Sequence, residues 1–133
     1  MFDIENLIEQ TQELTLLYVE DNEDARESTL FILDDLFDNI IIAVDGKDGL
    51  EKFKNNKIDL VITDVSMPNM DGLEMSRAIK EIDNSLSIII LTALTNTSTI
   101  KEATEMGIDN FINKPIDDVD LLFDNLKKIV KKQ

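Results

Sequence analysis

The sequence predicts a doubly wound α/β domain, in which helices cover both faces of a parallel sheet. Short, fully apolar runs alternate with longer segments whose apolar residues recur every three or four positions. The first pattern is typical of strands buried on both faces, and the second of helices with one apolar side. Regular alternation of the two favours parallel pairing through right-handed crossovers.

Five apolar runs are the expected strands, and each is followed by a segment with helical spacing. Because both faces of each strand are apolar, we expect the sheet to be buried between two layers of helices. The expected strands cover residues 14–19, 40–44, 60–62, 87–91 and 108–112.

The helices after the first two strands begin at residues that favour helix N-termini. Asn22 is a typical N-cap, and the segment Asp45-Gly-Lys-Asp-Gly leads into the second helix, where Gly49 would permit close packing against the sheet. The inward positions expected in these two helices are Ala25, Thr29, Ile32, Leu33, Leu36, Leu50 and Phe53.

The third expected helix follows a loop with Pro68, the fourth follows a polar run, and the closing helix follows a pair of acids. Thr99 and Glu102 fit a capping box, and Gly107 fits the end of the same helix. Asp117 or Asp118 is expected to cap the closing helix. The expected inward positions are Met75, Ala78, Ile79 and Ile82 in the helix after Gly72, and Val119, Leu122, Leu126, Ile129 and Val130 in the closing helix.

Residues 1–13 are expected to form an extension ahead of the main domain, which covers residues 14–133. Ile4, Leu7 and Ile8 have helical spacing, so a short amphipathic helix and a frayed leader both fit this extension. No repeat, low-complexity tract or Pro-rich linker divides the rest of the sequence. A stand-alone domain and a domain cut from a longer protein both fit.

The composition excludes several classes of function. Without Cys or His, the chain has no thiol chemistry, no serine-protease-like base and no typical zinc ligands. A formal charge of −15 repels nucleic acids and anionic membranes and favours cations or basic protein surfaces as partners. The chain has no apolar run approaching about 20 residues and no basic leader, so we expect a cytoplasmic protein.

Polar side chains that follow four of the strands should meet at one edge of the sheet. Glu20 and Asp21 follow the first strand, Asp64 the third, Thr92 the fourth and Lys114 the fifth. Three neighbouring carboxylates require a cation, and an all-oxygen site suits Mg²⁺. Asp64 would then act as the nucleophile toward a phosphoryl group that Lys114 and the Thr92 hydroxyl also hold.

These residues resemble the receiver domains of two-component response regulators, which accept a phosphoryl group from a histidine kinase on an aspartate. The resemblance extends from Leu14 to about Lys132. It implies a flavodoxin-like sheet of order 2-1-3-4-5 and a phosphoacceptor switch with no enzymatic activity beyond self-phosphotransfer and autodephosphorylation. The motifs that carry it are Val19-Glu20-Asp21-Asn22, the segment from Asp64 to Gly72, Leu91-Thr92-Ala93 and Asn113-Lys114-Pro115.

The resemblance also implies roles for individual residues. Asp64 would be the phosphoacceptor, and Glu20 and Asp21 would hold Mg²⁺ together with the backbone carbonyl of Ser66. It further implies that Thr92 and Lys114 contact the phosphoryl oxygens and that the Lys114–Pro115 peptide bond is cis.

A switch is expected to connect Asp64 to a surface that a partner recognises. Phe111 lies where the family has an aromatic switch residue that works with Thr92, although its alternation with Ile112 also fits a plain core position. The expected output face is the helix near 98–106, the strand 108–112 and the closing helix, with phosphorylation shifting a pre-existing equilibrium. The expected donor is a sensor histidine kinase or a phosphotransfer protein.

Two other functions fit part of this pattern. A phosphohydrolase resembling the haloacid dehalogenase family would carry a second Asp two residues after the nucleophile, where this chain has Ser66. A flavodoxin-like cofactor binder needs a phosphate-binding loop rich in Gly, Ser or Thr after the first strand, where this chain has Glu20-Asp-Asn-Glu-Asp24. Both departures disfavour these alternatives.

Overall fold

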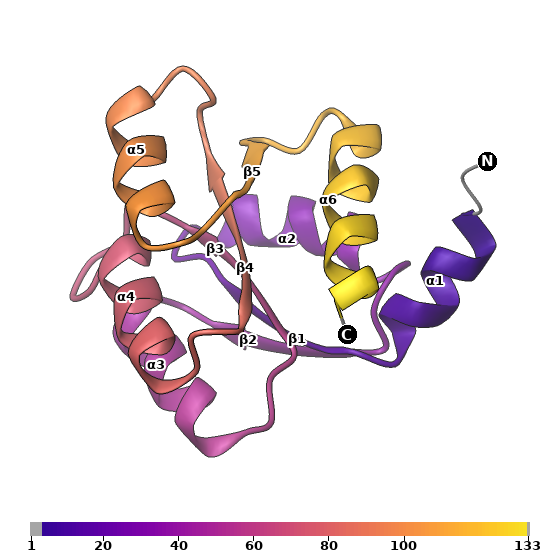
Figure 1. Cartoon of the computed structure of the whole chain (residues 1–133), viewed down its shortest axis with the longest axis horizontal. Helices are drawn as coiled ribbons and strands as arrows, with labels where there is room; N and C mark the ends of the chain where they lie inside the picture. The colour runs from indigo at the N-terminus through magenta and orange to yellow at the C-terminus, as the bar shows by residue number, and fades with distance from the viewer. Residues whose placement is uncertain (1–3, 133) are drawn as a thin grey trace.

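Five parallel strands form the centre of the molecule in the computed structural model, which describes residues 4–132 (Figure 1). Their order in the sheet is β2-β1-β3-β4-β5. The predicted fold class and strand order are therefore confirmed. The strands are β1 (Thr15–Val19), β2 (Asn39–Ala43), β3 (Leu60–Asp64), β4 (Ser87–Thr92) and β5 (Asn110–Asn113).

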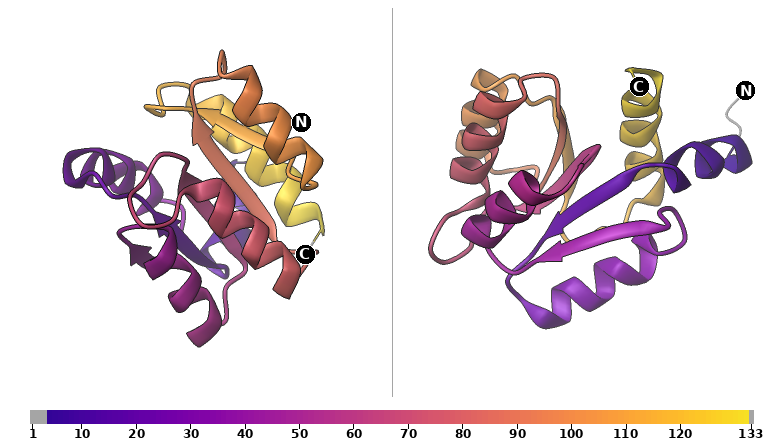
Figure 2. Two further views of the ribbon diagram at one scale, coloured as in Figure 1. Left: turned by 90° about the vertical axis from the view of Figure 1, so that its left-hand side faces the viewer. Right: turned by 90° about the horizontal axis from the view of Figure 1, so that it is seen from below.

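Helices cover both faces of this sheet, as the three views in Figures 1 and 2 show. α1, α2 and α6 pack on one face, and α3, α4 and α5 pack on the other. None of the helices within residues 4–132 is long and apolar enough to span a bilayer. The helices are α1 (Ile4–Gln12), α2 (Glu23–Leu33), α3 (Gly46–Asn55), α4 (Gly72–Ile82), α5 (Thr97–Glu105) and α6 (Val119–Lys132).

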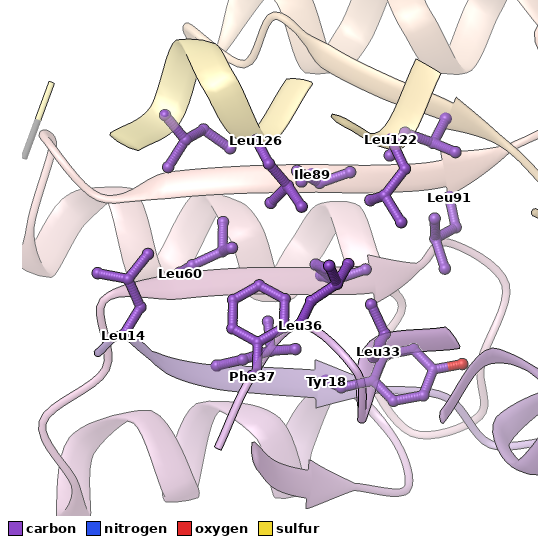
Figure 3. Packing of buried hydrophobic residues seen from close by; sticks show 14 of the residues in the cluster. Leu14, Tyr18, Leu33, Leu36, Phe37, Leu60, Ile89, Leu91, Leu122 and Leu126 are labelled. Atoms are coloured by element: carbon purple, nitrogen blue, oxygen red, sulfur yellow. The ribbon is translucent and has the colours of Figure 1, made fainter. Parts of the chain in front are cut away.

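Alternate residues of the strands supply the two cores. Leu16 and Tyr18 of β1 join the core under α1, α2 and α6, part of which Figure 3 shows, whereas Leu17 and Val19 join the core under α3 to α5. All four are fully buried. Gly49 of α3 packs against Val19 and Met75 as expected, because a Cβ there would lie 2.6 Å from the Met75 sulfur.

The structure corrects several expectations about the helices. Ile82, the last residue of α4, is 54% exposed, and Leu36 is buried but lies beyond the end of α2. Asn96, not Thr99, caps α5: its side chain accepts the Thr99 N–H within a helix that begins at Thr97. Val119 is exposed rather than inward, at the first turn of α6.

The two candidate caps of the closing helix are distinguished by a hydrogen bond. The Leu121 N–H donates to the Asp118 carboxylate, so Asp118 is the residue that caps α6. Gly107, with a positive φ of 88°, follows the end of α5 as predicted.

The N-terminal segment is a helix that packs on the domain. Leu7 is 2% exposed within the core of α2 and α6, and the Thr11 hydroxyl donates to the Leu36 backbone carbonyl, with the Ile8 carbonyl also within reach at 3.1 Å. The helical alternative for residues 4–12 is thus confirmed, and these contacts join α1 to the core that it shares with α2 and α6.

We therefore expect Leu7→Ala to lower the free energy of unfolding by about 2–5 kcal/mol, the usual cost of removing a buried leucine side chain. Ile4→Ala is the matched control, since Ile4 is 42% exposed on the same helix; it should cost less than about 1 kcal/mol. Urea unfolding measures both. Equally small losses would mean that α1 does not unfold together with the sheet.

Candidate functional site

The carboxyl ends of the central strands bring the predicted site residues to one edge of the sheet. Glu20 directly follows β1, and its N–H donates to the Ala43 carbonyl at the end of β2. Asp64 ends β3 and pairs in register with Leu91, one residue before Thr92. The Lys114 N–H donates to the Thr92 carbonyl, which places Lys114 beside the end of β4.

Three carboxylates form a cluster at this edge. Glu20, Asp21 and Asp64 each offer one oxygen, and these oxygens all lie within 4.8 Å of one another. Glu20 and Asp64 are buried, whereas Asp21 is exposed, so the cluster is reached from solvent on the Asp21 side. Such an all-oxygen donor set fits a hard divalent cation such as Mg²⁺.

Lys114 lies between two of these carboxylates. Its Nζ is 2.7 Å from Asp64 Oδ2 and 2.8 Å from Glu20 Oε1. Burial alone would lower the pKa of Lys114, but the hydrogen bonds and charges of Asp64 and Glu20 outweigh burial and raise it. The lysine therefore stays cationic and supplies a fixed positive charge beside Asp64.

Glu20 is a carboxyl group in an unfavourable environment. Burial raises its pKa, and the charge of Asp64 acts in the same direction. The Lys114 ammonium and the Asn22 N–H, which donates to Glu20 Oε2 at 3.2 Å, act in the opposite direction without cancelling the effect. A bound cation would offset the cost of burying this negative charge.

Arg26 is a residue of the site that sequence reasoning did not identify. Its Nη1 donates to the Glu20 backbone carbonyl at 2.8 Å, across the turn that carries the acidic pair. Asn22 caps α2 through the Ala25 N–H, as predicted, and so holds the same turn from its other side. The available signal was a basic side chain one helical turn after Asn22 in an otherwise acidic segment.

The loop from β3 to α4 is hydrogen-bonded to the segment that joins β2 to α3. The Asn69 amide donates to Asp45 Oδ2 at 2.7 Å, and the Gly46 N–H donates to the Met70 carbonyl at 3.0 Å. Hydrogen bonds from the Asp48 N–H and the Asn69 side chain hold the pKa of Asp45 below its ordinary value. Ser66 is an exposed residue of this loop, two positions after Asp64; its role as a metal ligand stays a prediction.

The candidate switch residues lie on β4 and β5. Thr92 is buried at the end of β4. Phe111 is half-buried, pairs in register with Ile90 and packs against the core under α3 to α5. This placement fits both a core residue and a switch, so the role of Phe111 stays a prediction. The Lys114–Pro115 bond is cis, as the resemblance implied.

Comparison with known proteins agrees with this geometry. Residues 16–125 match the family model of the response regulator receiver domain. The chain is 42% identical over 77 residues to the chemotaxis protein CheY of Treponema pallidum, an alignment that covers 56% of this chain and 54% of that protein. The chain spans about half the length of the curated relatives it matches first.

Solved structures show the same fold. A response regulator receiver domain protein from Clostridium thermocellum superposes with a TM-score of 0.80 and 26% identity, over 90% of this chain and 95% of that one. A chain of the CheX–CheY–BeF3–Mg²⁺ complex from Borrelia burgdorferi gives a TM-score of 0.75 and 29% identity, over 87% of this chain and 88% of that one.

Proposed function

Because the chain belongs to the response regulator receiver domain family, we propose that it is a signalling switch that accepts a phosphoryl group on Asp64. The observation that carries the assignment is the Lys114 ammonium, 2.7 Å from Asp64 Oδ2, beside a cluster of three carboxylates. This arrangement gives one aspartate both a cationic partner and a candidate metal site. The donor would be a histidine kinase or a phosphotransfer protein.

In this proposal an Asp64 carboxylate oxygen attacks phosphorus, a new O–P bond forms, and the bond from phosphorus to the donor breaks. Lys114 would then pair with the phosphoryl oxygens, and the Thr92 hydroxyl would donate to them. Mg²⁺, held by Glu20, Asp21, Asp64 and the Ser66 carbonyl, would supply charge neutralisation for the transfer. The Val65 N–H, which donates to Asp64 Oδ1 at 2.8 Å, orients the carboxylate.

We propose no enzymatic activity on other substrates, only phosphorylation and dephosphorylation of this chain itself. The test is incubation with a small phosphodonor such as acetyl phosphate and Mg²⁺, followed by intact mass spectrometry. We expect the mass of one phosphoryl group to be added, and we expect a chelator to prevent it. A protein that stays unmodified with Mg²⁺ present would overturn the proposal.

Mg²⁺ binding has a separate readout in stability. At ten times its dissociation constant, the ion should stabilise the folded protein by about 1.4 kcal/mol, because it binds the assembled carboxylates and not the unfolded chain. Asp21→Ala should lose most of this response, since Asp21 is the exposed member of the cluster. Asp24→Ala, an exposed acid of α2 outside the cluster, is the control. Thermal melts at several Mg²⁺ concentrations measure this response. A Tm that does not change with Mg²⁺ would contradict the proposed metal site.

We further propose that α5, β5 and α6 form the output face. Thr92 ends β4 and Phe111 lies on β5, so a shift of Thr92 toward a phosphoryl group would open space beside α5 for Phe111. The only buried residue of α5 is Ala103, and its first turn is polar, which suggests low local stability.

Amide exchange with and without BeF3⁻ as the phosphoryl mimic tests this face. We expect exchange rates to change in residues 95–113, because the mimic would shift the population of a second conformation there. Asp64→Asn, which removes the acceptor carboxylate, provides the blank. Changes confined to the loops around Asp64 would mean that the output lies elsewhere.

A further inference from the structure

An apolar groove lies between α1, the second half of α2 and the start of α6, three helices that Figure 1 shows together on one side of the sheet. Its volume is about 360 Å³. Phe31 is 81% exposed, and Ile4 and Val119 beside it are also exposed. Single exposed apolar residues are ordinary, but several that share one concave surface mark an interaction site. Each helix contributes two apolar side chains: Ile4 and Ile8, Phe31 and Ile32, and Val119 and Phe123.

One wall of this groove lies outside the part of the chain that matches the family model. Ile4 and Ile8 belong to α1, which ends before residue 16, where the match to the family model begins. α1 is held in place by buried Leu7 and by the hydrogen bond from Thr11 to the Leu36 carbonyl. The groove is therefore a built feature, and its use goes beyond the phosphoacceptor function.

The rim of the groove is acidic. Asp35 lines it, and none of its lining residues, all within the described part of the chain, is basic. Glu5 and Asp120 are exposed, and each lies one helical turn before a lining residue, Ile8 and Phe123 respectively. The whole chain carries a formal charge of −15. An occupant of this groove must thus bring apolar side chains and positive charge together.

We propose that the groove binds an amphipathic helix of a partner protein, whose apolar side chains enter between α1, α2 and α6 and whose flanking Lys or Arg residues meet the acidic rim. A helix presents apolar residues at i, i+3, i+4 and i+7, which suits an apolar groove between helices. A second copy of this chain would place acidic rim against acidic rim. Anionic membranes are repelled for the same reason.

A labelled 18-residue amphipathic peptide, with leucines on one face and lysines beside them, is the probe, and its binding is followed by fluorescence anisotropy. Phe31→Ser should weaken binding about tenfold or more, as expected for an aromatic anchor. The Tm of this variant should stay unchanged, because Phe31 is so exposed. Ile82→Ser is the matched control: Ile82 is also an exposed large apolar residue, but it lies on α4. This control variant should bind like the wild type.

The charge requirement is tested with the same peptide carrying glutamates in place of the lysines. We expect it to bind about tenfold more weakly or worse, and we expect salt to reduce the difference. No binding of the lysine peptide, equal binding of both peptides, or an equal loss in Ile82→Ser would overturn the proposal.

Other occupants give different results. A wild-type dimer in sedimentation that Phe31→Ser converts to a monomer would assign the groove to a second copy instead. Binding to phosphatidylglycerol vesicles that Phe31→Ser abolishes would assign it to a membrane. Both outcomes overturn the proposal. Phosphoryl labelling by acetyl phosphate should be the same in Phe31→Ser and in the wild type, so a failure here is separate from a failure at Asp64.

Discussion

Asp64→Asn is expected to abolish phosphoryl labelling by a small phosphodonor, because an amide lacks the anionic oxygen that attacks phosphorus. Two carboxylates contact Lys114, so Glu20 is the rival acceptor. The Glu20 side chain is 1% exposed, whereas that of Asp64 is 11% exposed. Burial also raises the pKa of Glu20, which disfavours its anionic form. Asp64 is thus the acceptor that a donor can reach.

Intact mass spectrometry after equal incubation measures this loss. Asp109→Asn is the control, since Asp109 is an exposed acid just before β5, at the opposite edge of the sheet, and it should label like the wild type. A label that persists in Asp64→Asn and disappears in Glu20→Gln would transfer the acceptor role to Glu20.

The assembly of this site was predictable because topology alone enforces it. Parallel strands in the order found must bring the residues after β1, β3, β4 and β5 to one edge, whatever their side chains. The sequence therefore indicated that Glu20, Asp64 and Lys114 would be neighbours. It did not indicate that one ammonium would contact both carboxylates, because that depends on side-chain conformations.

The predictions that the structure corrected failed for equally physical reasons. Helical periodicity predicted an inward Ile82, but periodicity does not show how deeply the last residue of a helix is covered. Consecutive residues around the start of α5 are all able to cap a helix, so spacing alone chose Thr99 where the structure uses Asn96. Arg26 was missed because it acts through the Glu20 backbone carbonyl, a contact that no residue pattern shows.

The position of Asp64 depends on the close approach of α4 to the end of β3. The Gly72 N–H donates to the Val65 carbonyl at 2.7 Å. A Cβ on Gly72 would lie 2.0 Å from the Asp64 carbonyl oxygen and 3.0 Å from its carbonyl carbon. Both are backbone atoms, so no side-chain rotation relieves the overlap, and the start of α4 or the end of β3 must move.

Gly72→Ala should therefore lower the free energy of unfolding by about 3 kcal/mol, the upper end of typical overpacking costs, although alanine ordinarily stabilises a helix relative to glycine. Phosphoryl labelling should also slow, about a hundredfold for a displacement near 1 Å, because the acceptor carboxylate moves with its backbone.

Gly107→Ala provides the comparison for Gly72→Ala. Gly107 has a φ of 88°, and a Cβ added there would meet no described atom within 4 Å, so alanine adds backbone strain without steric overlap. It should cost about 1–2 kcal/mol and leave labelling unchanged, since Gly107 lies near Ser87 at the amino ends of the strands, whereas Asp64 lies at their carboxyl ends. Urea unfolding and labelling rates together separate the two effects. If Gly72→Ala loses stability but labels at the wild-type rate, the contact of α4 with β3 supports the fold without positioning Asp64.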